Sequence, residues 1–226
     1  MKIILAGCEY VGTTTIANKL SAWKQDVMGE GFSLIHDHSK IPHTSGHPDD
    51  TTLEEQAQIL ALSPKLKEMY SRYHIYYHVH HYRGDDDLTV GFHIEESIYA
   101  QMYYGYGLPG EQYDRALING QIESRIKQIT DDPIIVVHMT ASPEILVRRM
   151  SEMKDTPDHT NSLVKESDIP TILDRFREGV DRSSLGPKIK IDTSAGSPDD
   201  TLAELVEAIQ PHLTDLDRQR IEKHGT

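Results

Sequence analysis

The sequence has little cysteine, fewer basic than acidic residues and no long hydrophobic run. Its one cysteine, Cys8, excludes an intramolecular disulfide, which favours a reducing compartment. The apolar run at the N-terminus spans about five residues, far below the ~18 residues that a membrane-spanning helix needs. We therefore expect a cytoplasmic protein that does not insert into a membrane.

The shortage of basic residues argues against polyanionic partners. There are 23 Lys and Arg residues against 36 Asp and Glu, and the formal net charge is -13. Such a negative potential repels nucleic-acid polymers and anionic membrane surfaces. A small phosphorylated ligand is still compatible with this charge, because one site can concentrate backbone amides and cations. We therefore expect a small-molecule partner and neither nucleic acid nor membrane.

The organisation of the chain favours one domain over residues 1–226. Hydrophobic residues make up 37% of the sequence, and no internal repeat or long linker divides it. Short apolar runs rich in β-branched residues alternate with helical patterns, which predicts an α/β fold: a doubly wound parallel sheet of about five strands with helices on both faces. The predicted strands are Lys2–Ala6, Phe32–His36, Leu88–Ile94, Ile134–Met139 and Ile189–Asp192.

Helical patterns fill the intervals between these strands. Ser142 and Ser197 are each followed by proline, which is typical of a helix start with a cap and proline in the first turn. The charged tail, Leu216–Thr226, is expected to fray or to extend the last helix. The predicted helices are Thr14–Gln25, two within Leu53–Tyr82 with a break near Ser63-Pro64, Ser97–Tyr104, Glu111–Thr130, Pro143–Met153, Ile169–Arg182 and Pro198–His212.

A glycine-rich loop, GCEYVGTTT at residues 7–15, follows the first strand directly. It matches the mononucleotide-binding pattern G-x-x-x-x-G-K-[ST], except that Thr13 replaces the lysine. Glycines let the backbone wrap an anion, and the helix N-terminus adds its positive end. Thr14 stands where a hydroxyl would ligate Mg²⁺; an ordinary glycine turn is the alternative interpretation. The residues predicted to bind the phosphates are Gly7, Gly12, Thr13, Thr14 and Thr15.

The absent lysine leaves two functions open. In loops of this type the ammonium group bridges the β- and γ-phosphates and neutralises transition-state charge, so its loss can cost several kcal/mol of catalysis. Either another cation takes its place and the protein transfers phosphate, or the protein binds a phosphorylated ligand without transferring it.

Four segments, in order along the chain, resemble thymidylate kinases and deoxynucleoside kinases. AGCEYVGTTTIANKL (6–20) is similar to their phosphate loop and first helix, and HIEESIYAQMYYGYG (93–107) to the stretch that carries Asp-Arg or Glu-Arg-Ser after the third strand. VVHMTASPEILVRRM (136–150) resembles the strand and helix before the lid, and IDTSAGSPDDTLAELVEAI (191–209) the last strand and helix. The resemblance implies a P-loop NTPase-type fold, ATP with Mg²⁺ as cofactors, and a homodimer packed through helices.

Individual residues carry this resemblance further. Glu95 matches the family's acidic residue, Tyr104 its later aromatic residue and Arg149 its arginine before the lid, whereas Glu96 stands where the family has arginine. A carboxylate near the end of a strand can accept a proton from an attacking hydroxyl or hold Mg²⁺ through water. We therefore predict Glu95 and Arg149 as catalytic residues and Tyr104 as substrate-binding. The alternatives are a surface ion pair for Arg149 and a core or interface position for the tyrosines.

Two further segments carry weaker predictions. Residues 150–166 have the length and composition of a mobile lid, and Arg149 and Lys154 would reach the phosphates when it closes. Asp37 or Lys40 follows the second strand, where substrate-binding residues usually lie in this architecture. We take Asp37 as the predicted substrate residue.

The 13 histidines are an unusual number for this length. His36 ends the second predicted strand, and His74 and His78 share one helix face, so a transition-metal site is one interpretation. We favour instead a semi-polar helix that lines a substrate pocket or a dimer face, because no downstream residue completes a clear ligand set.

Taken with the resemblance, the sequence favours an ATP-dependent phosphotransferase that acts on a nucleoside, a nucleoside monophosphate or a similar small hydroxyl compound. The alternative is a catalytically degenerate kinase fold that binds a nucleotide or phosphorylated ligand. Specificity in such proteins comes from the shape of the pocket, so the acceptor is not identified.

Overall fold

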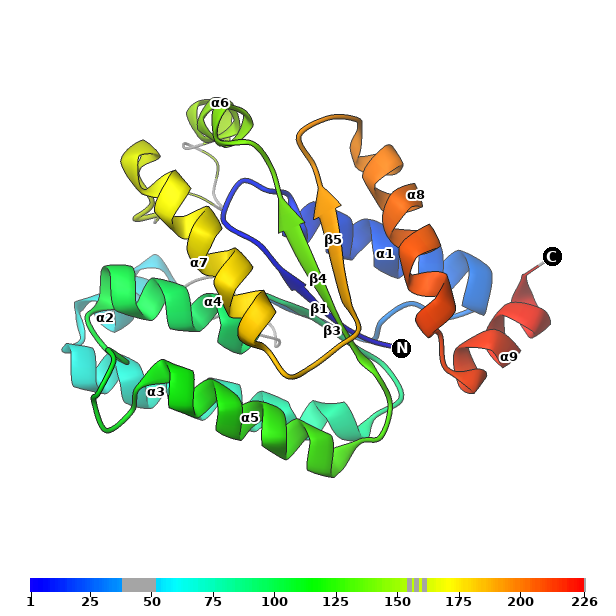
Figure 1. Ribbon diagram of the computed structural model, residues 1–226, viewed down its shortest axis with the longest axis horizontal. Coiled ribbons are helices and arrows are strands. Elements are labelled where there is room, and N and C mark those ends of the chain that lie inside the picture. Colours follow the sequence, from blue (N-terminus) through cyan, green and yellow to red (C-terminus); the bar gives the residue numbers. More distant parts are fainter. Residues whose placement is uncertain (38–51, 154–155, 157–158, 160–161, 226) are drawn as a thin grey trace.

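The structure, a computed structural model, describes residues 1–37, 52–153, 156, 159 and 162–225. In this part of the chain five parallel strands form one sheet in the order β2-β3-β1-β4-β5 (Figure 1). This agrees with the predicted parallel α/β fold. The strands are β1 (Lys2–Ala6), β2 (Ile35–Asp37), β3 (Asp87–Val90), β4 (Ile134–Thr140) and β5 (Lys188–Asp192).

Strand β1 is the middle strand of the sheet, and every one of its residues is buried. Its sequence, KIILA, pairs with β3 on one side, where Ile3 faces Leu88, and with β4 on the other, where Ile3 faces Ile135. The chain therefore builds the sheet on one side of β1 first and then crosses to the other side. In open α/β sheets, ligands bind at the carboxyl ends of the strands beside such a switch point.

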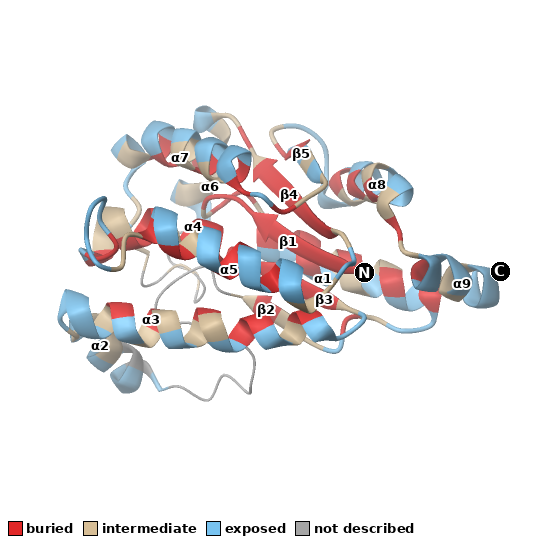
Figure 2. Ribbon diagram, turned by 60° about the horizontal axis from the view of Figure 1, so that its bottom comes forward, coloured by how far each residue is buried: buried red, intermediate tan, exposed pale blue. Residues whose placement is uncertain are grey.

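Helices cover both faces of the sheet (Figure 1). Helices α1 and α8 pack on one face, and α4, α5 and α7 lie on the other, while α3 lies beside α5. Figure 2 shows β1, β3 and β4 buried between these layers and the outer sides of the helices exposed, whereas β5 at the edge of the sheet is exposed along most of its length. The helices are α1 (Thr13–Met28), α2 (Leu53–Ala61), α3 (Pro64–His78), α4 (Phe92–Tyr99), α5 (Arg115–Ile129), α6 (Pro143–Met153), α7 (Ile169–Arg182), α8 (Pro198–Ile209) and α9 (Asp215–His224).

Local sequence signals set most of these boundaries. Helices α6 and α7 begin and end at the predicted residues, and α8 starts at the predicted cap, where Ser197 and Asp200 form a reciprocal capping box. The predicted break near Ser63-Pro64 separates α2 from α3. The charged tail is neither frayed nor continuous with α8. It forms α9, capped by Thr214, and packs on α1.

The predicted strand Leu88–Ile94 is too long at its carboxyl end. Strand β3 ends at Val90, and Gly91 and Phe92 turn the chain sharply with φ values of 77° and 51°. Helix α4 then begins at Phe92, five residues before the predicted helix start at Ser97, and continues as a π-helical turn over Ala100–Tyr104. A short apolar run fits either a buried strand or a buried helix turn, so its periodicity could not separate the two.

Strand β2 is displaced toward the C-terminus from the predicted Phe32–His36. Phe32 is buried ahead of the strand, and the Lys24 ammonium lies 5.4 Å from the centre of its ring. The β-ladder with β3 starts only at Ile35, which faces Leu88. The displacement moves Asp37 from the loop to the last position of an edge strand.

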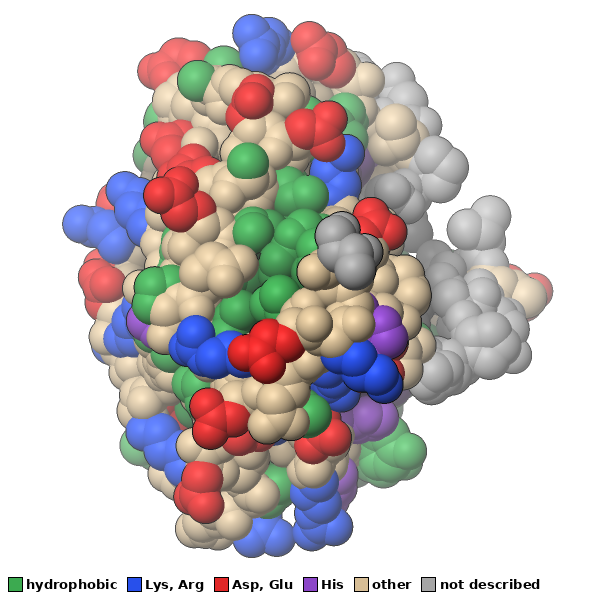
Figure 3. All heavy atoms as spheres, turned by 90° about the vertical axis from the view of Figure 1, so that its right-hand side faces the viewer, with side chains coloured by type: hydrophobic (Ala, Val, Ile, Leu, Met, Phe, Trp, Pro, Cys, Tyr) green, Lys and Arg blue, Asp and Glu red, His purple; other side chains and the backbone are tan. Residues whose placement is uncertain are grey.

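Among the described residues, no helix combines the length and the apolar character needed to cross a membrane. Figure 3 shows the end of the molecule that carries α8 and α9. Acidic and basic side chains are interspersed there around a small hydrophobic area, so this face does not present one sign of charge to a partner.

Candidate functional site

The loop of residues 7–15 leaves the carboxyl end of β1 and leads into α1. Gly7 is required by space, because a Cβ atom there would lie 2.6 Å from the Met139 carbonyl oxygen and 2.8 Å from Val11 Cγ1. Gly12 is required by conformation, because its φ of 97° is left-handed and L side chains rarely adopt it. The two predicted glycines thus shape the loop for different reasons.

The N-terminus of α1 provides the anion-attracting end of the site. The first N–H groups of a helix lack acceptors within the helix, and the N-cap Gly12 has no side chain to satisfy them. The helix starts with Thr13, Thr14 and Thr15, so no acidic side chain opposes an anion in that turn. Thr14 and Thr15 are exposed, whereas Thr13 is buried. The lysine position of the loop pattern therefore carries an enclosed, uncharged hydroxyl.

The Thr14 hydroxyl lies next to the carboxylate of Asp37. Thr14 Oγ1 donates a hydrogen bond to Asp37 Oδ2 at 3.1 Å, from the first turn of α1 to the end of β2. The structure thus joins the predicted metal ligand to the predicted substrate residue. Hydroxyl and carboxylate oxygens are hard ligands of the kind Mg²⁺ prefers, so this pair fits that ion. Lys40, the other residue considered for substrate contact, lies outside the described residues.

Glu95 lies in the first turn of α4. The sequence analysis had placed it just past the end of a strand. Its side chain is buried against the turn at Gly91, where a Cβ atom would lie 2.7 Å from Glu95 Oε2. Burial, followed by the charges of Glu95 and Glu9, raises the pKa of the Cys8 thiol well above its usual range. The charge of Glu95 thus acts on Cys8, the second residue of the loop.

Tyr99, which the sequence analysis did not assign to the site, contacts the loop directly. The backbone N–H of Glu9 donates to the Tyr99 hydroxyl at 3.1 Å. Burial and the charges of Glu95 and Glu9 raise the pKa of Tyr99 well above its usual range, so its hydroxyl stays protonated. The Glu9 amide of the loop is therefore already hydrogen-bonded to a protein side chain. The sequence showed tyrosines at 99, 103, 104 and 106 but not which of them faces the loop.

Arg149 binds the carbonyl side of the phosphate loop. Its Nη1 donates to the carbonyl oxygens of Tyr10 (3.2 Å) and Val11 (3.4 Å) and to Thr193 Oγ1 (3.0 Å), and its Nη2 to the Thr193 carbonyl (2.6 Å). The guanidinium thus ties the loop to the segment after β5. Thr193 supports the same contact, because its hydroxyl also donates to Val11 O at 3.0 Å. The predicted contact of Arg149 with phosphate stays a prediction.

Glu96, at the family's arginine position, is buried in an ion pair that the sequence did not reveal. Arg115 Nη2 and Nε lie 2.8 and 3.0 Å from Glu96 Oε1, and Arg115 Nη1 lies 3.1 Å from Glu68 Oε1. The Tyr106 hydroxyl donates to the same Glu96 oxygen at 2.8 Å. A cation, Arg115, therefore lies beside Glu96. Arg115 has no exposed surface, however, and its N–H groups are hydrogen-bonded to the Glu96 and Glu68 carboxylates.

Tyr104, predicted to bind substrate, is buried beside this ion pair. Its ring stacks on Tyr106 with centroids 6.5 Å apart, and the Lys67 ammonium lies 5.7 Å from its centre. The π-helical turn at Ala100–Tyr104 places it there. Its contact with substrate stays a prediction.

The described part of the lid-like segment contacts the phosphate loop. The ring of His159 stacks on Tyr10 with centroids 4.2 Å apart, and His159 Nδ1 lies 3.5 Å from Glu9 Oε2. Tyr10 has a positive φ of 68°, uncommon outside glycine. Composition predicted a lid but gave no signal for His159 in particular. Lys154 lies outside the described residues.

Known structures share this arrangement over nearly the whole chain. The YorR protein of Bacillus subtilis, in complex with phosphorylated GDP, superposes with a TM-score of 0.58 at 19% identity and covers 95% of this chain and 99% of its own. Deoxyadenosine kinase from M. mycoides with dCMP and dCDP gives 0.56 at 14% identity, with coverage of 93% and 99%. Thymidylate kinase from Ehrlichia chaffeensis gives 0.51 at 14%, with coverage of 93% and 98%.

No protein-family model matches this sequence, and neither does any curated protein. The similar structures cover nearly the whole chain, but their sequence identity to it is low. The chain therefore has the P-loop α/β fold of deoxynucleoside and thymidylate kinases, as the sequence resemblance predicted.

Proposed function

We propose that this protein is an ATP-dependent phosphotransferase that acts on a nucleoside, a nucleoside monophosphate or a similar small hydroxyl compound. The observation that carries the proposal is the junction of the phosphate loop with Asp37. A loop shaped by Gly7 and Gly12 opens onto the N-terminus of α1, and the Thr14 hydroxyl there meets a carboxylate at 3.1 Å. Support comes from the structural neighbours, which include a deoxyadenosine kinase and a thymidylate kinase.

Each predicted residue has a role that its position allows. The loop amides and the α1 N-terminus would bind the phosphates, and Thr14 and Asp37 would hold Mg²⁺, which when bound neutralises phosphate charge. Glu95 would accept the proton of the attacking hydroxyl or hold a water of the ion. Arg149 would keep the loop in its binding conformation through the carbonyls of Tyr10 and Val11.

The supply of positive charge decides how this site would work. Thr13 brings no charge, and the four hydrogen bonds of Arg149 already go to protein oxygens. Glu9 and Glu95 add negative charge near the loop. Backbone amides and Mg²⁺ would therefore have to neutralise the negative charge of the phosphates. We expect ATP to bind much more weakly without the ion.

The same charge distribution supports a second candidate function. A degenerate kinase fold that holds a nucleotide or phosphorylated ligand would need the loop amides but not a transition-state cation. Thr13, together with the engagement of Arg149 by carbonyl oxygens, favours this alternative.

Calorimetric titration with ATP, ADP and a panel of nucleoside monophosphates, with and without Mg²⁺, tests binding, and an acceptor screen then tests turnover. For the enzyme, Glu95→Gln should keep ATP affinity and lose turnover, while the exposed Glu204→Gln on α8 should keep both. ATP binding without transfer to any acceptor would support the degenerate fold. If folded protein binds no adenine nucleotide, the kinase proposal fails.

We also propose a homodimer formed through α3 and α5. Exposed apolar side chains recur on one side of α3, with Tyr73 67% and Tyr77 61% exposed, and Leu117 of α5 is 64% exposed. The two helices lie side by side (Figure 2), joined by a hydrogen bond from the Tyr76 hydroxyl to Gln121 at 3.3 Å. Exposed apolar side chains that gather on one part of a surface often mark a contact with another protein.

A further inference from the structure

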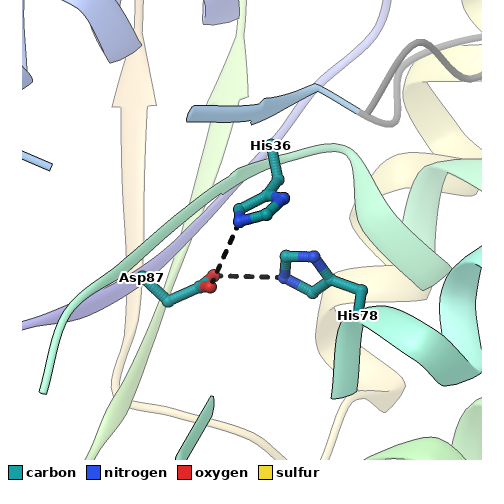
Figure 4. Close-up of side chains that lie close together, drawn as sticks. All are labelled: His36, His78 and Asp87. Carbon is teal, nitrogen blue, oxygen red and sulfur yellow. Dashed lines mark hydrogen bonds and ion pairs between the residues drawn. The ribbon is translucent and has the colours of Figure 1, made fainter. Parts of the chain in front are cut away.

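Three polar side chains from separate elements converge beside the edge strand of the sheet (Figure 4). His36 comes from β2, His78 from the last turn of α3 and Asp87 from the first position of β3. All three are buried, with relative exposures of 6%, 2% and 4%. Such burial is rare for two imidazoles and a carboxylate unless they are paired or bind a metal.

The donor atoms have the spacing of a metal-ligand set. His78 Nε2 lies 3.2 Å from Asp87 Oδ1, His36 Nε2 lies 3.9 Å from Asp87 Oδ2, and one ligand atom from each residue lies within 4.8 Å of the others. Tetrahedral Zn²⁺ with bonds of about 2.0–2.1 Å separates its ligand atoms by about 3.3 Å. Figure 4 shows both imidazoles directed at the same carboxylate, so a small contraction would bring all three to one ion.

The surroundings prepare these groups to bind a cation. His78 Nε2 lies 3.2 Å from Asp87 Oδ1, within hydrogen-bonding distance of the carboxylate. Thr89 Oγ1 donates to Asp87 Oδ1 at 2.6 Å and lies 3.0 Å from His78 Nε2. A hydroxyl that orients a carboxylate in this way is typical of the partners that support metal ligands.

We propose that His36, His78 and Asp87 supply three ligands of a four-coordinate zinc site that is separate from the phosphate loop. Two imidazoles with one carboxylate suit Zn²⁺ and other transition metals, whereas Mg²⁺ prefers oxygen ligands alone. The ion would cross-link β2, a strand of three residues, to β3 and α3. Because His36 directly precedes Asp37, it would also fix the strand end that contacts Thr14.

The test is direct metal binding by the full chain, stripped with a chelator and dialysed. We expect one Zn²⁺ per chain, bound at or below micromolar Kd in competition with a chromophoric chelator, and a higher melting temperature with the ion. Co²⁺ should give the intense visible absorption of a four-coordinate site. Absence of Zn²⁺ binding, or only the weak spectrum of six-coordinate Co²⁺, would overturn the proposal and leave a hydrogen-bonded cluster.

Variants locate the ion. His78→Gln and Asp87→Asn preserve approximate size and hydrogen bonding, and each should weaken Zn²⁺ binding about 100-fold or more while circular dichroism confirms folding. The matched control is His80→Gln, because His80 is exposed on the segment that follows α3. Equal loss in the control and in His78→Gln would place the ion elsewhere. Because every readout is metal binding, failure here leaves the proposed phosphotransferase function untouched, and failure of ATP binding leaves this site untouched.

Discussion

Replacing Arg149 by methionine should destabilise the protein before any ligand is added. Methionine keeps most of the apolar stem but removes the guanidinium and its contacts with the phosphate loop and Thr193. The sequence alone assigned Arg149 to phosphate. The structure gives it a positioning role that can be measured in the free protein.

The contacts of Arg149 set the size of the effect. Val11 O keeps a second donor, the Thr193 hydroxyl at 3.0 Å, whereas the carbonyl oxygens of Tyr10 and Thr193 each lose a charged donor. Hydrogen bonds to charged groups contribute about 1.5–3 kcal/mol each, and Arg149 is only half-buried, which reduces this. We expect the free energy of unfolding to fall by about 2–4 kcal/mol.

Urea unfolding of the ligand-free protein measures this change, with an unchanged slope showing that the folded state is intact. Arg148→Met is the matched control on the same helix, since Arg148 is exposed and should change stability by less than about 0.5 kcal/mol. If both variants are equally stable while Arg149→Met alone loses ATP affinity, the guanidinium acts on the ligand and the positioning argument is refuted.

Three further predictions follow from buried charges and from the apolar surface. Arg115→Met should cost about 3–5 kcal/mol because the buried Glu96 carboxylate loses its cation, whereas Glu68 keeps Arg72 at 3.0 Å; adding Glu96→Gln should recover part of this cost, and simple additivity in urea unfolding would contradict the pairing. Glu123 has its pKa lowered from 4.5 to about 2, because hydrogen bonds from His93 and two serines outweigh burial. Its stabilisation is present above pH 4.5 and lost as the pH falls toward about 2, so Glu123→Gln should flatten the acid-side stability profile, and an unchanged profile would exclude this group. Tyr73→Glu should give a monomer in sedimentation at concentrations where the parent is a dimer, and a parent that is itself monomeric would end the dimer proposal.

Much of the fold could be predicted because its signals are local. Strand, glycine loop and helix follow one another within residues 2–28, so β1, the phosphate loop and α1 were predicted together. Proline and serine caps gave the starts of α6 and α8. The error at Leu88–Ile94 came where local information was ambiguous, since an apolar run continues across the turn at Gly91.

The candidate site was predictable only in part. Gly7, Gly12 and the threonines follow a contiguous pattern whose conformation the loop itself determines. Thr14 and Asp37 were chosen separately, and only folding showed that they touch. Tyr99 and His159 could not be selected from the sequence, because their contacts with the loop depend on how α4 and the lid-like segment pack against it.

The sequence by itself determined the class of the fold and the place of the glycine-rich loop, because hydrophobic periodicity and glycine conformation act over a few neighbouring residues. Only the tertiary structure decided the partners of the charged groups. Arg115 finds Glu96 and Glu68 across three helices, and His36 and His78 meet Asp87 from elements far apart in the chain. Burial makes such pairings strong, yet they depend on the packing of whole elements and leave no mark in the spacing of residues along the chain.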